Sequence, residues 1–133
     1  GLAVLKSSRG AAFGDLDNDG DVDIVINNSR DRPTLLRNDG GNQGHWIQFD
    51  LHGTQCNRDA VGTRIYVTCG GKRQFRERFA GGSYCSSSDP RLHFGLGDAA
   101  LIGRVEIVWP GGHKEILEKV SANQILSITE SGK

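Results

Sequence analysis

The 133-residue chain has 16 basic and 16 acidic residues, so its formal net charge at pH 7 is zero. No overall field attracts nucleic acid or an anionic membrane, and no apolar run approaches the roughly 20 residues that span a bilayer. This length suffices for one core, and 19 glycines between short apolar runs indicate a turn-rich β protein. Because the sequence contains no methionine, we interpret it as part of a longer chain.

Short segments of alternating apolar and polar residues predict an all-β fold, and their spacing predicts a sandwich or a barrel. A tight hairpin is expected at Gly70-Gly71. A helical turn is expected at most at residues 98–102 and 118–122. In chain order, the expected strands lie at residues 11–13, 22–26, 47–51, 65–69, 74–79, 92–96, 104–109, 114–117 and 124–129.

The polar, glycine-rich segment at residues 38–44 marks a boundary between two parts of unequal size, because such a composition cannot build a core. Residues 1–44 hold an acidic loop with about three strands. Residues 45–133 hold about seven, which is enough for a β domain of their own.

Between residues 15 and 23, every second residue is an aspartate, and a glycine, Gly20, stands at the sixth position. Calcium takes six to eight oxygen ligands, and alternate residues of a tightly curled loop converge on one point. The sequence therefore predicts a calcium site; the alternative is a solvated acidic turn. The expected ligands are the side chains of Asp15, Asp17, Asp19 and Asp23 and the backbone carbonyl of Asp21.

The acidic loop differs from an EF-hand, which requires a glutamate at the twelfth position and a helix on each side. The twelfth position is Ile26, and both flanks are predicted strands. We therefore expect a rigid structural site rather than a helix-opening switch.

With the motif FGDLDNDGDVDI, residues 13–24 resemble an FG-GAP (VCBS-type) repeat, the calcium-loop unit of integrin α-subunit propellers. Residues 45–130 resemble the ASPIC/UnbV domain that follows such repeats in cartilage acidic protein and in bacterial secreted proteins. The motifs that carry this second resemblance are, in order, NRDAVGTR from Asn57, GGSY from Gly81, LHFGLG from Leu92, VWPGG from Val108 and ANQ from Ala122. The two resemblances imply a partial β-propeller blade followed by a β domain, bound calcium and an extracellular, secreted or periplasmic location, without implying a defined ligand.

The three cysteines fit no metal-ligand spacing. Cys69 continues the apolar set of a predicted strand and is expected to be a buried thiol, whereas Cys56 and Cys85 lie in polar surroundings. We expect a disulfide between the latter two in oxidising conditions.

No enzyme motif is apparent. The histidines, His45, His52, His93 and His113, form no metal-binding pattern, and His93 is interpreted as an ordinary strand residue. The polar segment at residues 81–89 lacks the second glycine of a G-x-S-x-G motif. The chain is therefore predicted not to be an enzyme.

Three functions were weighed. The first is a calcium-stabilised adhesion or interaction module at the C-terminal end of a secreted propeller protein. The second is a carbohydrate-binding module that uses Trp46, Trp109, Tyr66 or Tyr84 for stacking beside basic strands, since residues 56–82 carry six basic residues against two acidic ones. The third is an accessory domain of a biosynthetic enzyme.

The strand at residues 22–26 is apolar at consecutive positions, which is typical of a strand covered on both faces. Without neighbouring blades it needs another cover. We expect residues 1–44 either to pack on the downstream domain through residues 22–26, Leu35 and Leu36, or to pair with a second copy of the chain.

Overall fold

A computed structural model describes residues 5–132, and within these residues the secondary structure consists of strands without helices. No helix of the length and apolarity needed to cross a membrane occurs in the described part of the chain. The strands are β1 (Ser8–Gly14), β2 (Asp23–Asn28), β3 (Thr34–Leu36), β4 (His45–His52), β5 (Arg64–Cys69), β6 (Lys72–Glu77), β7 (Leu92–Gly97), β8 (Leu101–Val108), β9 (Lys114–Ser121) and β10 (Gln124–Thr129).

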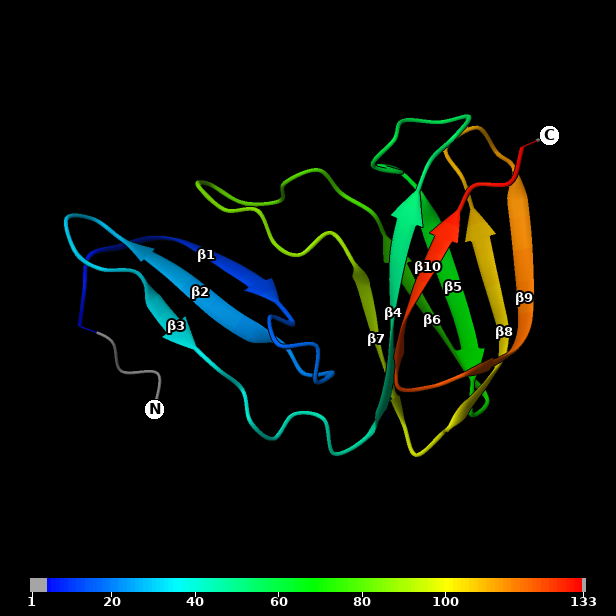
Figure 1. Cartoon of the computed structure of the whole chain (residues 1–133), viewed down its shortest axis with the longest axis horizontal. Helices are drawn as coiled ribbons and strands as arrows, with labels where there is room; N and C mark the ends of the chain where they lie inside the picture. Colours follow the sequence, from blue (N-terminus) through cyan, green and yellow to red (C-terminus); the bar gives the residue numbers. More distant parts are fainter. Residues whose placement is uncertain (1–4, 133) are drawn as a thin grey trace.

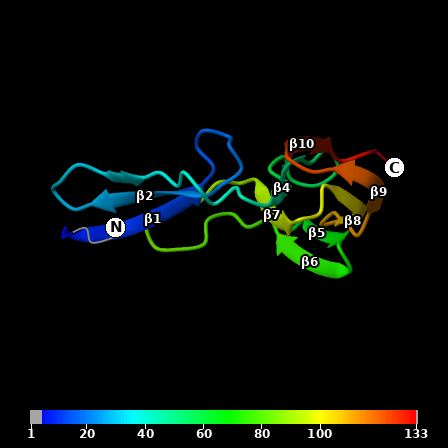
Figure 2. The same ribbon diagram turned by 90° about the horizontal axis from the view of Figure 1, so that it is seen from below.

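Strands β4 to β10 form a β-sandwich. One sheet has the order β10-β4-β7, with β10 parallel to β4, and the other has the order β6-β5-β8-β9. The sheets face each other (Figures 1 and 2), and alternate residues of their strands form the core. The buried apolar residues that form the core cluster are Ile47, Phe49, Leu51, Ala60, Ile65, Val67, Cys69, Leu92, Phe94, Leu96, Ile102, Val105, Ile107, Trp109 and Ile128. The predicted all-β fold is confirmed, and its sandwich form is found rather than a barrel.

Most predicted strands are present, with local corrections. Residues 101–102 and 118–121 belong to β8 and β9, so no helical turn forms there. Strand β6 ends at Glu77, and the predicted strand residue Phe79 lies beyond it and is exposed. The hairpin at Gly70-Gly71 is confirmed: both glycines have positive φ, at 55° and 73°, as a two-residue I′ turn requires.

Strands β1, β2 and β3 form a separate antiparallel sheet that extends away from the sandwich (Figures 1 and 2). Its register places Ala12, Val25 and Leu35 on one face and Phe13, Ile24 and Leu36 on the other. Val25, Leu35 and Phe13 are exposed. Leu35 is exposed and does not pack on the sandwich as expected, whereas the alternative, pairing with a second copy of the chain, remains a prediction.

The small sheet instead meets the sandwich through the loop that follows β1 and along the outer edge of β1. At this edge the Ser86 hydroxyl accepts from the Ala11 N–H at 2.9 Å. The Asp89 N–H donates to the Phe13 carbonyl at 2.8 Å. The long connection from β6 to β7 thus covers part of the edge that a further strand would otherwise pair with.

All three cysteines are free thiols. Cys69 is buried, as predicted, but the expected bridge between Cys56 and Cys85 is absent. Cys56 lies in the loop after β4, where its N–H donates to Glu130 and its thiol to the Asn57 carbonyl, and burial raises the pKa of this thiol. Cys85 lies in the connection that runs along β1, where its carbonyl is next to Gly10. The two cysteines therefore lie in different loops with different contacts.

Glu130 joins the end of β10 to the loop that follows β4. Its Oε2 accepts hydrogen bonds from the backbone N–H groups of Thr54, Gln55 and Cys56, at 3.0, 2.8 and 2.9 Å. Burial acts to raise the pKa of this carboxyl, but the three N–H donors outweigh burial and lower the pKa from 4.5 to about 2.

This pKa shift predicts how stability depends on pH. Because the folded-state pKa lies below the ordinary value, the stabilisation is complete above about pH 4.5 and is lost as the pH falls toward 2. Glu130→Gln should lower the free energy of unfolding at pH 7 by about 2 kcal/mol, because charged hydrogen bonds are replaced by neutral ones. The deficit should shrink as the pH falls, measured by urea unfolding at pH 7, 4 and 2.5. Glu118→Gln, an exposed change on β9, is the control; a deficit that is constant with pH would contradict the assignment.

Candidate metal centre

The acidic loop, residues 15–23, connects β1 to β2 and turns back on itself. Gly14 and Asp23 are partners in the β1–β2 ladder, so the two ends of the loop lie side by side. Asn18 and Gly20 adopt positive φ, at 61° and 98°. Asparagine and glycine tolerate this conformation best, and it reverses the chain within a few residues.

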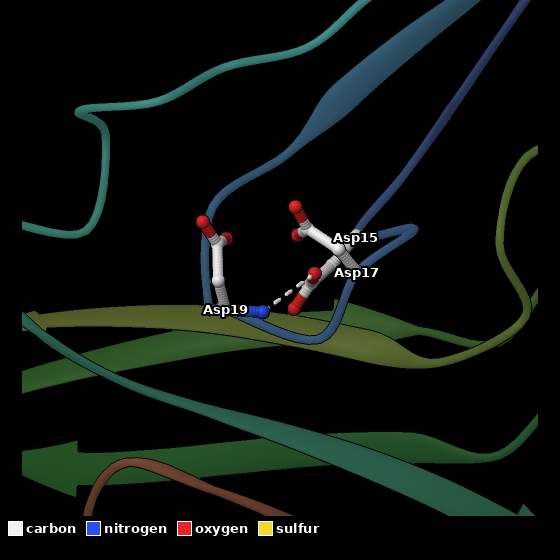
Figure 3. A group of neighbouring side chains, drawn as sticks. All are labelled: Asp15, Asp17 and Asp19. Atoms are coloured by element: carbon white, nitrogen blue, oxygen red, sulfur yellow. Dashed lines mark hydrogen bonds between the residues drawn. The ribbon is translucent and has the colours of Figure 1, made fainter.

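This reversal brings together three of the predicted ligands. One carboxylate oxygen from each of Asp15, Asp17 and Asp19 lies within 4.8 Å of the others, and the side chains lie around one space within the loop (Figure 3). Oxygens at this spacing can approach a common calcium ion at the usual 2.3–2.6 Å with little movement.

Aspartates of the acidic loop also accept hydrogen bonds from the backbone of the same loop. Asp15 accepts from the N–H groups of Asp19 and Gly20, at 3.1 and 3.0 Å. Asp19 accepts from Asp21 N–H at 3.0 Å, and Asp23 accepts from Leu16 N–H at 3.0 Å. These bonds stabilise the curled backbone of the loop.

Two further carboxylates hold the segment at residues 38–44. The Asn38 N–H donates to Asp23 Oδ1 and the Gly41 N–H donates to Asp21 Oδ2, both at 2.9 Å. Asp23 therefore bonds the loop and the connecting segment at once, and Asp23 is absent from the three-carboxylate group. Asp21 turns one side-chain oxygen toward the connecting segment and is also absent from the three-carboxylate group; its expected ligation through the backbone carbonyl remains a prediction.

Asp17 differs from the other four aspartates. Among the hydrogen bonds of residues 5–132, none uses its carboxylate, whose one ion pair is to Arg37 at 3.8 Å. Partial desolvation and the neighbouring charges of Asp19, Asp23 and Asp15 raise the pKa of Asp17, with Arg37 acting in the opposite direction. Its oxygens therefore accept no hydrogen bond from the described residues and lie near other negative charges.

The residues fit a hard divalent cation. An ionised carboxylate offers about four acceptor positions, and Asp15 uses three of them. Asp21 is only 3% exposed, and its Oδ1 has no hydrogen-bond partner among the described residues. An unpaired buried carboxylate oxygen is costly, and a cation or its bound water would satisfy it.

Four residues of the sandwich also contact the acidic loop, and sequence reasoning assigned none of them to this site. Gln48 Nε2 donates to Asp15 Oδ2 at 2.5 Å. Arg91 donates to the Asp15 carbonyl and to Asn18 Oδ1, both at 2.6 Å. His93 Nε2 bonds the Gly20 carbonyl at 3.0 Å and therefore carries the proton; its ring stacks on Trp46.

These residues lie on the outer face of the β10-β4-β7 sheet. Gln48 alternates with the core residues Ile47 and Phe49, and this pattern predicted a solvent-facing side chain. It is buried because the acidic loop covers this face. Arg91 is held in place by Asp89: burial acts to raise the pKa of Asp89, but hydrogen bonds from Arg91 outweigh it and lower that pKa. The sequence gives no signal that these two distant segments meet.

The sandwich part of the chain matches a known protein family. Residues 53–133, well over half of the chain, match the family described as ASPIC and UnbV. The chain belongs to the ASPIC and UnbV family. A comparison with curated proteins found no match. The family match covers Arg91 and His93, whereas Trp46 and Gln48 lie just before it on β4. The resemblance of residues 13–24 to an FG-GAP repeat lies outside the match and remains a prediction.

The histidines of this ASPIC and UnbV chain are distributed over separate contacts. His45 bonds Asn123 at 2.9 Å, and His52 lies 3.3 Å from Asp50. His113 is near Ser131 and Glu115, but both of these residues approach the same ring nitrogen, Nε2, at 3.0 and 3.6 Å. A catalytic triad places its acid on the opposite ring nitrogen, so this group lacks triad geometry.

Proposed function

We propose that this ASPIC and UnbV chain is a non-catalytic, extracellular interaction module whose acidic loop binds one calcium ion. The observation that carries the proposal is the convergence of Asp15, Asp17 and Asp19 oxygens within 4.8 Å. Asp17 supports it because its oxygens are free of backbone donors. The calcium ion would neutralise the repulsion within the loop and so stabilise the junction from which the small sheet extends.

In this proposal the small sheet is a partial propeller blade at the end of a longer secreted protein. Apolar side chains on both of its faces, including Val25, Leu35 and Phe13, favour further packing partners. The neighbouring blade of the parent protein or a second copy of the chain would supply them. Adhesion or matrix contact is the corresponding biological role.

The calcium proposal is tested most sharply at Asp17, because Asp17→Ala removes a ligand and a charge without removing a backbone hydrogen bond. Calcium at 100 times its dissociation constant should stabilise the folded chain by about 2.7 kcal/mol. This corresponds to a rise in melting temperature of roughly 10 °C for a domain of this size. The rise should be abolished in Asp17→Ala and retained in Asp98→Ala, which removes an exposed carboxylate outside the loop. An unchanged melting temperature of the wild-type chain at millimolar calcium would sink the proposal.

Carbohydrate binding is the second candidate, and the exposure of Tyr84 favours it. Of the four aromatic residues considered, Trp109 is buried, Trp46 stacks on His93, and Tyr66 is covered by Phe75 and Arg73. Tyr84 is 79% exposed and lines a cavity of about 620 Å³ between β1 and the connection from β6 to β7, together with Arg9 and several serines. A sugar ring can stack on such an aromatic face while hydroxyl groups bond the polar rim.

For this second candidate, Tyr84→Ala should abolish binding to any glycan that an array identifies for the wild-type chain. Phe79→Ala is the matched control, because Phe79 is an exposed aromatic residue of the same connection that lies outside this cavity. Absence of glycan binding by the wild-type chain, with and without calcium, would reject the carbohydrate function and leave the calcium proposal intact.

A further inference from the structure

The sandwich holds the acidic loop at both ends of its turn. Arg91 donates to the Asp15 carbonyl at 2.6 Å, where the loop begins. His93 donates to the Gly20 carbonyl at 3.0 Å, five residues later. Arg91 immediately precedes β7 and His93 lies within it. One short segment of the sandwich therefore fixes both ends of the part of the loop that carries Asp15, Asp17 and Asp19.

Gln48 reaches the cluster itself. Its side chain is 1% exposed, and its amide nitrogen donates to Asp15 Oδ2. Its amide oxygen has no hydrogen-bond partner among the described residues. A buried amide with an unpaired oxygen is costly, and a water molecule beside Asp15 would satisfy it.

Gly20 allows the loop and the sandwich to approach each other closely. A Cβ atom added to Gly20 would overlap the indole ring of Trp46. With φ at 98°, the residue also adopts a conformation that other residues rarely take. The contact is therefore built for one loop conformation, the one that brings Asp15, Asp17 and Asp19 together.

From these contacts we propose that the cation site is completed across the boundary between the two parts: Gln48, Arg91 and His93 of the sandwich are positioning residues that hold the acidic loop in its ligating conformation. The inference rests on the proposed calcium binding. Calcium binding and docking of the loop on the sandwich then stabilise each other.

The physical reason is preorganisation. Without help, the loop must bring like charges together before a cation binds, and the cost of this arrangement lowers the affinity. Hydrogen bonds from the sandwich stabilise the loop in this arrangement and so offset part of the repulsion. Linkage requires the coupling to be reciprocal: a change that weakens docking by some factor weakens calcium binding by the same factor.

Calcium titration calorimetry on the full chain tests the proposal with Gln48→Leu and Arg91→Lys. Each variant removes hydrogen bonds to the loop while leaving every proposed ligand in place. The expected result is a dissociation constant raised about 10-fold or more, the usual effect of losing a contact behind a metal ligand. Gln74→Leu is the matched control, since Gln74 donates to the Gly95 carbonyl of β7 and not to the acidic loop, and it should leave the constant unchanged.

A second readout separates positioning from general damage to the fold. Calcium should protect residues 38–44 from limited proteolysis in the wild-type chain, because Asn38 and Gly41 are held by loop carboxylates. In the two variants this protection should require more calcium, while the near-ultraviolet circular dichroism from the buried Trp109 stays unchanged. Arg91→Lys keeps the charge and carries the test if Gln48→Leu does not fold.

The outcomes distinguish the two proposals. Absence of calcium binding by the wild-type chain rejects the proposed function and, with it, this inference. Calcium binding by the wild-type chain with equal affinity in Gln48→Leu, Arg91→Lys and Gln74→Leu overturns the inference alone and leaves a calcium site that the loop forms by itself.

Discussion

The position of the small sheet depends on the hydrogen bonds of the acidic loop. These bonds join the loop to itself, to the connecting segment at residues 38–44 and to the sandwich. The loop carboxylates accept hydrogen bonds from backbone N–H groups of the loop itself and from those of Asn38 and Gly41 in the connecting segment. Asp15 also accepts from Gln48 of the sandwich. The same carboxylates repel one another, so the interactions that join the two parts also carry an electrostatic cost. A bound cation would remove the cost and keep the hydrogen bonds.

The small sheet is attached to the sandwich by a few polar contacts rather than by a large apolar interface. Its apolar faces remain open, and its attachment runs through polar contacts at the acidic loop and along the edge of β1. Polar contacts of this kind depend on geometry, and a loop with several like charges keeps its geometry only when they are balanced. The sandwich has its own core and does not depend on this balance.

Sequence reasoning predicted the sandwich strands well because their cores follow a strict two-residue alternation, as in Ile65, Val67 and Cys69. It predicted that the side chains of Asp15, Asp17, Asp19 and Asp23 converge for the same local reason, and the structure brings together the first three. It failed where the answer depends on contacts between distant segments. Gln48 reads as a solvent-facing residue until the acidic loop is placed over β4, and Cys56 and Cys85 look like a pair until their loops are placed. No local pattern predicts which outer face of a sheet another segment covers.

The most direct test of the central claim is the relative orientation of the two parts, measured from backbone N–H residual dipolar couplings on the full chain with and without calcium. We predict that one alignment tensor fits the amides of both β1–β3 and the sandwich when calcium is bound, because the loop is then held by cation and sandwich together. Without calcium, or in Asp17→Ala, the small sheet should need a separate, weaker tensor. A single tensor that fits both parts equally well with and without calcium would contradict the claim that the cation stabilises this junction.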